Sequence, residues 1–217
     1  MQEKDKQKYI NRYEERYERY GYDPKTLGWT KGRQKLRYHI LTSIGPLQGK
    51  SVLDLGCGFA DLYDYLREKG WNGEYTGFDI VPKLIEVARQ RHPDLSLRLL
   101  DILSEPVEQK FDYTFASGVF NAKISQNNEE YIFAMLKRML EITNIGVAAD
   151  FLSTYVDFQH EGAFHASPEH IFAIARSLTR RVSLRHDYLA YEFCIYLFKA
   201  DQMTKENGVF DEYVPLL

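Results

Sequence analysis

The sequence has little that would suit an extracellular, metal-binding or membrane protein. Only two cysteines occur in 217 residues, Cys57 and Cys194, too few for a disulfide framework and without the spacing of a metal site. No apolar run approaches the roughly 18 residues of a membrane helix, and the first twenty residues are mostly charged or tyrosine, unlike a signal peptide. We therefore predict a cytoplasmic protein with no metal and no membrane partner.

Strong charge of one sign is also missing. The chain has 28 Lys and Arg against 31 Asp and Glu, a net charge of −3, which disfavours nucleic acid as its main partner. No repeat, low-complexity segment or Pro-rich linker interrupts it. Apolar residues make up 44%, enough for one large core. We predict that the chain consists of an N-terminal helical cap over residues 1–45, a main domain over 46–200 and a C-terminal tail over 201–217.

Short β-rich runs alternate with helical stretches from residue 51 onward, which is typical of a parallel sheet with helices on both faces. The expected strands are 51–55, 74–79, 96–100, 110–117, 145–152, 181–186 and 191–199. The last two are close enough in sequence to form an antiparallel hairpin. The sequence therefore predicts an α/β fold with a doubly wound, mostly parallel sheet.

The most informative segment is the glycine turn that joins the first strand to a helix. Gly56 and Gly58 allow a ligand to approach the backbone, and the helix end offers unpaired N–H groups. A dinucleotide site has a third glycine where this chain has Asp61, and Asp54 directly precedes the turn. Two carboxylates oppose a pyrophosphate and favour a ligand with positive charges.

Two further aspartates lie at the ends of the next two strands. Asp79 lies 21 positions after Gly58, where a carboxylate can accept hydrogen bonds from both ribose hydroxyls. Asp101 can accept from an adenine amine, while Ile80 and Ile102 cover the ring faces. Asp54 and Asp101 can alternatively serve only as helix-capping or turn residues, and Asp79 alone would suit a nicotinamide cofactor equally well.

This ordered series resembles the Rossmann-like S-adenosylmethionine-dependent methyltransferases over roughly residues 36–199. The motifs are Asp54–Gly58, Asp79, Asp101 and the run 111–118. The resemblance implies seven strands with the last antiparallel, and S-adenosylmethionine as cofactor. Many members carry a glycine where this chain has Ala60, which we expect to begin the helix without a forbidden backbone angle.

The resemblance also assigns the cofactor contacts residue by residue. Backbone atoms of the turn would contact the methionine end, Asp54 would assist the ammonium group, and Ser117 would flank the sulfonium. The turn residues are Gly56, Cys57 and Gly58. We further predict that Arg37 pairs with the methionine carboxylate beside Trp29, the alternative being a surface arginine and a packing tryptophan.

The loop over residues 153–167 mixes aromatic and titratable side chains and is longer than ordinary connections, which fits an acceptor-binding loop. We predict His160 and His165 as acid–base residues, together with Asp150 at the end of the preceding strand, although each histidine can be an ordinary surface residue. His186 is a weaker alternative.

The predicted function is transfer of a methyl group from S-adenosylmethionine to oxygen or nitrogen of a small molecule, by a monomer or homodimer. The run 116–119 lacks the motif of enzymes that methylate adenine in DNA. The alternatives are a non-catalytic binding protein of the same fold and a nicotinamide oxidoreductase. Four early tyrosines share one helix face, either as packing or as a lid over the ligand: Tyr9, Tyr13, Tyr17 and Tyr20.

Overall fold

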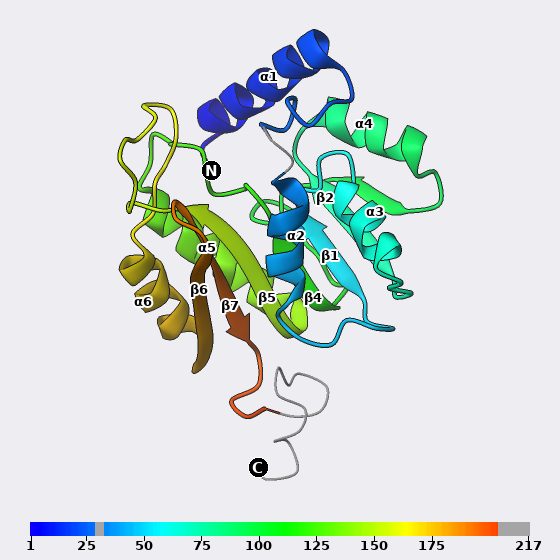
Figure 1. The fold of residues 1–217 in the computed structure, drawn as a ribbon. Coiled ribbons are helices and arrows are strands. Elements are labelled where there is room, and N and C mark those ends of the chain that lie inside the picture. Colours follow the sequence, from blue (N-terminus) through cyan, green and yellow to red (C-terminus); the bar gives the residue numbers. More distant parts are fainter. Residues whose placement is uncertain (29–32, 204–217) are drawn as a thin grey trace.

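The computed structural model describes residues 1–28 and 33–203 and contains one seven-stranded sheet (Figure 1). The strands are β1 (Val52–Leu55), β2 (Tyr75–Asp79), β3 (Ser96–Leu99), β4 (Phe111–Ala116), β5 (Thr143–Leu152), β6 (Arg181–Leu189) and β7 (Glu192–Phe198). The helices are α1 (Glu3–Tyr20), α2 (Gln34–Thr42), α3 (Asp61–Glu68), α4 (Pro82–Arg91), α5 (Asn128–Glu141) and α6 (Pro168–Leu178).

The strand order is β3-β2-β1-β4-β5-β7-β6. The first five strands in this order pair in parallel, whereas β7 is antiparallel to both β5 and β6. The predicted fold class and the closing hairpin are therefore confirmed. Because the strand order reverses between β1 and β4, their carboxyl ends form the crevice where open α/β sheets bind ligands.

Helices cover both faces of the sheet, so its central strands carry apolar residues on both sides. Every residue of β1, β2 and β7 is buried. One core cluster joins the sheet to α2, α3 and α4, and the other joins it to α5 and α6. Two helices are capped by side chains, since Asn127 and Ser167 accept hydrogen bonds from N–H groups of the first turns of α5 and α6.

Helix α1 crosses above the carboxyl ends of the strands, next to α4 (Figure 1). Tyr9, Tyr13 and Tyr17 are half-buried and pack against the cluster that contains Phe59. Tyr20, at the end of the helix, is 38% exposed. The tyrosine stripe thus attaches α1 to the domain through three of its four rings. No helix in the described part of the chain is both long and apolar enough to cross a membrane.

Candidate functional site

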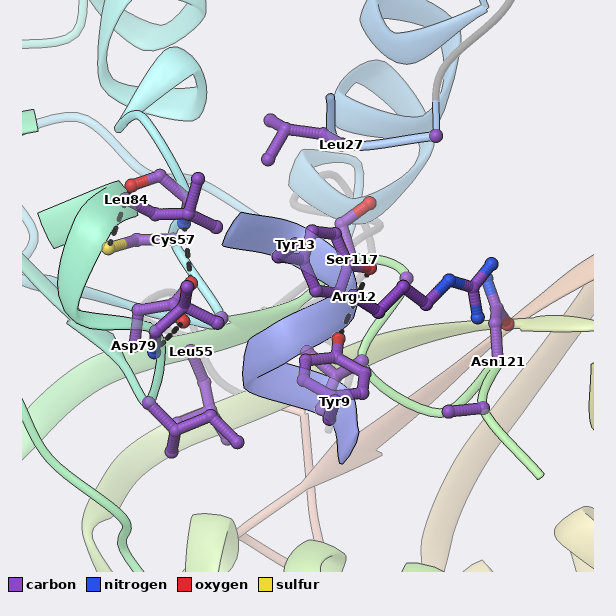
Figure 2. Close-up of a pocket in the computed structure, with 18 of the residues that line it drawn as sticks. Tyr9, Arg12, Tyr13, Leu27, Leu55, Cys57, Asp79, Leu84, Ser117 and Asn121 are labelled. Carbon is purple, nitrogen blue, oxygen red and sulfur yellow. Dashed lines mark hydrogen bonds between the residues drawn. The ribbon is translucent and has the colours of Figure 1, made fainter. Parts of the chain in front are cut away.

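A cavity of about 560 Å³ lies between the carboxyl ends of the strands and α1. Its floor comes from the segments that follow β1, β2, β3 and β4, and its roof from α1, of which Figure 2 labels Tyr9, Arg12 and Tyr13. Arg16 of the same helix also lines the cavity. The structure brings most of the predicted site residues into its lining. They are Arg37, Asp54, Gly56, Cys57, Gly58, Asp79, Ile80, Asp101, Ile102, Ser117 and His160. Trp29 lies outside the described residues.

The glycine turn after β1 is held by the neighbouring strand. The N–H groups of Gly56 and Cys57 donate to the Phe78 carbonyl at 2.7 and 3.0 Å. Gly56 and Gly58 both have positive φ, and a Cβ built on Gly56 would lie 2.6 Å from Cγ2 of Val119. Glycine at position 56 therefore allows both the positive φ of the turn and the close approach of the segment after β4.

The expectation for Ala60 was wrong. Its φ of 63° and ψ of 32° place it in the left-handed region, and α3 begins one residue later at Asp61. The Ala60 N–H donates to the Cys57 carbonyl at 2.8 Å, which closes a further turn before the helix starts. This conformation costs an L-residue about 1–2 kcal/mol, which explains why glycine suits this position.

Asp54 and Asp79 form the acidic centre of the floor. The Tyr75 hydroxyl donates to Asp54 at 2.7 Å, and the N–H groups of Gly58 and Val81 donate to Asp79 at 2.8 and 2.9 Å. Burial raises the pKa of Asp54 to about 7, against the lowering effect of Tyr75 and with a further raising effect of Asp79. Burial also raises the pKa of Asp79, while its hydrogen bonds oppose this. Lone pairs remain on both carboxylates for a ligand with hydroxyl or ammonium groups.

Asp101 lies at the far end of the floor, where α1 reaches it. The Lys6 ammonium approaches its carboxylate at 3.3 Å, and the Leu103 N–H donates to it at 3.1 Å. Ile102 is buried and Ile80 is half-buried, and both line the cavity. The adenine contacts proposed for these residues remain predictions, and α1 shares Asp101 with any such ligand.

Asp150 lies beneath the cavity, not in its lining. Its carboxylate accepts from the Ser117 hydroxyl at 2.7 Å and from the Gly118 N–H at 2.6 Å, and the residue is 2% exposed. Burial raises its pKa to about 6, although the nearby Arg37 guanidinium lowers it. This geometry gives Asp150 a positioning role for the turn after β4. Its predicted catalytic role stays a prediction.

Arg37 extends from α2 to the start of β7. Its guanidinium makes a bidentate ion pair with Glu192, and the two side chains are only 10% and 3% exposed. Arg37 also lines the cavity, so its predicted contact with the donor carboxylate stays a prediction. Sequence reasoning missed Glu192, because a charged residue at the start of a strand is ordinary and the pairing spans 155 positions.

The two predicted histidines occupy different environments. His160 is exposed, lines the cavity and meets Phe158 edge to face, with 5.1 Å between ring centroids. His165 lies outside the lining, with Nδ1 2.9 Å from the Ser153 carbonyl oxygen. Its Nε2 is buried and has no hydrogen-bond partner among the described residues. Of the two, His160 is placed to meet a ligand in the cavity.

The segment after β4 also contributes Asn121, which sequence reasoning missed. Its side-chain oxygen accepts from the Leu152 N–H at 3.2 Å, and its carbonyl accepts from the Phe164 N–H at 3.0 Å. It therefore links the end of β5 to the loop over residues 153–167 and lines the cavity. Within residues 1–28 and 33–203, no group of three or more His, Cys, Asp or Glu side chains could hold a metal ion.

Comparisons with known proteins agree on one family. A family model described as a methyltransferase domain matches residues 47–169. A Mycobacterium tuberculosis protein that is named a methyltransferase is 31% identical over 156 residues, which cover 69% of this chain and 93% of that protein. A ubiquinone biosynthesis O-methyltransferase of Paracidovorax citrulli is 35% identical over 98 residues, 42% of this chain and 35% of its own length.

The fold agrees with solved structures as well. Magnesium protoporphyrin IX methyltransferase from Synechocystis PCC 6803, with bound SAH, superposes with a TM-score of 0.64 at 16% identity. The match covers 90% of this chain and all of that structure. At this identity the likeness concerns the fold alone.

Proposed function

Because the chain belongs to the Rossmann-like S-adenosylmethionine-dependent methyltransferase family, we propose that it methylates an oxygen or nitrogen atom of a small molecule. The observation that carries this proposal is the cavity between the strand ends and α1, which combines an acidic floor with an aromatic and basic roof. The floor suits a cationic donor, and the remaining space beside the loop over residues 153–167 suits a second, small reactant. The family assignment argues against the oxidoreductase alternative.

The residues present fit the donor. The donor supplies an electrophilic methyl group on a sulfonium that leaves as a neutral thioether. Asp54 and Asp79 retain acceptor capacity for an ammonium group and for ribose hydroxyls, and Asp150 holds the turn that carries Ser117. The contribution of the chain is then mainly to position two reactants, an effect that can reach effective molarities of about 10⁵–10⁸ M.

In this proposal the acceptor binds beside the loop over residues 153–167. His160 is the candidate base for an acceptor that arrives protonated, because it is the predicted titratable residue of this loop that lines the cavity. A cytoplasmic location and a monomeric or homodimeric state complete the proposal.

Turnover tests the proposed function directly. We expect the purified protein to bind S-adenosylmethionine in calorimetry and to release S-adenosylhomocysteine when fractions of a small-metabolite extract are added. Asp150→Asn is expected to lower the turnover number more than the donor affinity, because it loosens the turn after β4 without touching the ligand. Donor binding without any S-adenosylhomocysteine would favour the non-catalytic alternative, and absence of donor binding would contradict the proposal.

Donor affinity is expected to depend on pH through Asp54. Its pKa of about 7 lies above the ordinary value, so the carboxylate is protonated in the free protein at pH 6 and ionised at pH 8. Only the ionised form attracts an ammonium group, so affinity should fall as pH drops through 7, by up to about tenfold per unit. Calorimetry between pH 5.5 and 8.5 measures this.

Two controls isolate the Asp54 effect. Tyr75→Phe removes the hydrogen bond that lowers the pKa of Asp54, so the midpoint should move to higher pH. 5′-Methylthioadenosine lacks the ammonium group but keeps the ribose. Titration of Asp79 should therefore change its affinity and that of S-adenosylmethionine alike, and the ratio of the two affinities cancels this effect. A ratio that stays constant with pH would remove Asp54 from ammonium binding.

A further inference from the structure

The charged residues that line the cavity are separated by sign, apart from Arg37 of α2, which is paired with Glu192. Asp54, Asp79 and Asp101 lie on the floor at the strand ends, whereas Arg12 and Arg16 lie on the roof in α1. The donor's sulfonium and ammonium groups are complementary to the floor. The roof therefore favours negative charge on whatever binds beside the donor.

Arg12 is the roof arginine whose guanidinium N–H donors are available to a ligand. Nε of Arg16 donates to the Lys25 carbonyl at 3.1 Å, and the guanidinium of Arg37 is paired with Glu192. Arg12 makes no hydrogen bond or ion pair with any described residue. Figure 2 shows its side chain extending from α1 toward Asn121.

Asn121 presents a second donor at the same place. Because its side-chain oxygen accepts from the Leu152 N–H, the amide group is fixed with its NH₂ directed away from that contact. This NH₂ donates to no described residue. The backbone of Asn121 is also held by Phe164, so this donor is positioned before any ligand arrives.

We infer that Arg12 and Asn121 form an oxyanion subsite, and that the methyl acceptor is a small molecule carrying a carboxylate or phosphate group. This inference rests on the proposed function and specifies its substrate class. A guanidinium and a carboxamide together offer a fork of N–H donors that matches the oxygens of such a group. The subsite adjoins the acceptor loop, since His160 and Ala163 line the same cavity.

Binding of benzoate and benzamide tests the subsite, because these probes differ only in charge and donor capacity. Each is titrated into protein saturated with S-adenosylhomocysteine and followed by ligand-observed NMR. We expect the wild type to bind benzoate about tenfold more tightly than benzamide, as one charge-assisted pair provides. Arg12→Gln should abolish this preference. Equal binding of the two probes by the wild type would overturn the inference.

Two further variants keep the test independent of folding. Asn121→Asp retains an oxygen for the Leu152 N–H but places a carboxylate where the NH₂ was, so it should favour benzamide. Arg19→Gln removes a charge from the same helix outside the cavity lining, and should keep the wild-type preference. If Arg19→Gln also lost the preference for benzoate over benzamide, the preference would come from the overall charge of α1, and the proposed subsite would be wrong.

The donor's own carboxylate is the other source of the same chemistry. S-adenosylhomocysteine contains that group and 5′-methylthioadenosine does not. If Arg12→Gln weakens binding of the first about tenfold and leaves the second unchanged, Arg12 serves the donor and the acceptor assignment is overturned. We expect both affinities to be unchanged. A wild type that binds neither nucleoside would instead contradict the proposed function, which separates the two failures.

Discussion

Replacement of Asp79 by alanine should weaken S-adenosylmethionine binding at least about 100-fold. The variant removes a buried carboxylate positioned by the N–H groups of Gly58 and Val81, together with its capacity to accept from two ribose hydroxyls. Hydrogen bonds to a charged group contribute about 1.5–3 kcal/mol each. Loss of two such bonds amounts to about 3 kcal/mol, or two orders of magnitude in the dissociation constant.

Calorimetry well below the melting temperature measures this effect. Because Asp79→Ala also leaves two buried N–H groups unpaired, circular dichroism and thermal melts must first show that the variant is folded. Asp94→Ala, at an exposed position between α4 and β3, serves as the matched control and should bind like the wild type. An unchanged affinity in a folded Asp79→Ala protein would remove Asp79 from the ribose site.

Replacement of Arg37 by methionine should lower the free energy of unfolding by about 3–5 kcal/mol. The variant leaves Glu192 buried without its partner, and removing one member of a buried pair costs this much. It also removes the positive charge of Arg37, which lowers the pKa of Asp150 and so favours its ionised form. Glu192→Gln should cost less, because Asp150 still compensates the Arg37 charge. Urea denaturation of the three proteins measures the difference.

The ion pair between Lys35 of α2 and Glu68 of α3 provides an exposed pair for comparison. Its side chains are 68% and 56% exposed, so Lys35→Met should change the free energy of unfolding by less than about 1 kcal/mol. The double variant Arg37→Met/Glu192→Leu should recover much of the loss, since apolar residues can replace a buried pair. Equal, small effects of Arg37→Met and Lys35→Met would show that the buried pair contributes little.

The architecture could be predicted because its signals are local. The glycine turn after β1, the alternation of strands and helices and the aspartates at strand ends all lie within short stretches of sequence. Parallel topology then brings Asp54, Asp79 and Asp101 to one edge of the sheet. For this reason the floor of the cavity is the part of the site that could be predicted from the sequence.

The remaining features depend on packing between distant segments. Glu192 reaches Arg37 because β7 lies beside β5, which no local pattern specifies. Arg12 faces the cavity only because the tyrosines of α1 attach that helix above the strand ends. Ala60 takes the left-handed conformation where the turn closed by its hydrogen bond to Cys57 joins α3, and an alanine in the sequence gives no sign of it.

The place of β7 in the sheet constrains how the protein folds during synthesis. β7 is translated last of the seven strands, yet it fills the position between β5 and β6. Until residues 192–198 have left the ribosome, one edge of β5 has no strand beside it, and the Arg37 guanidinium has no Glu192 to pair with. An unpaired strand edge can pair with other chains. A nascent chain that pauses before β7 therefore exposes a strand edge that can pair with other chains, and synthesis of β7 covers it.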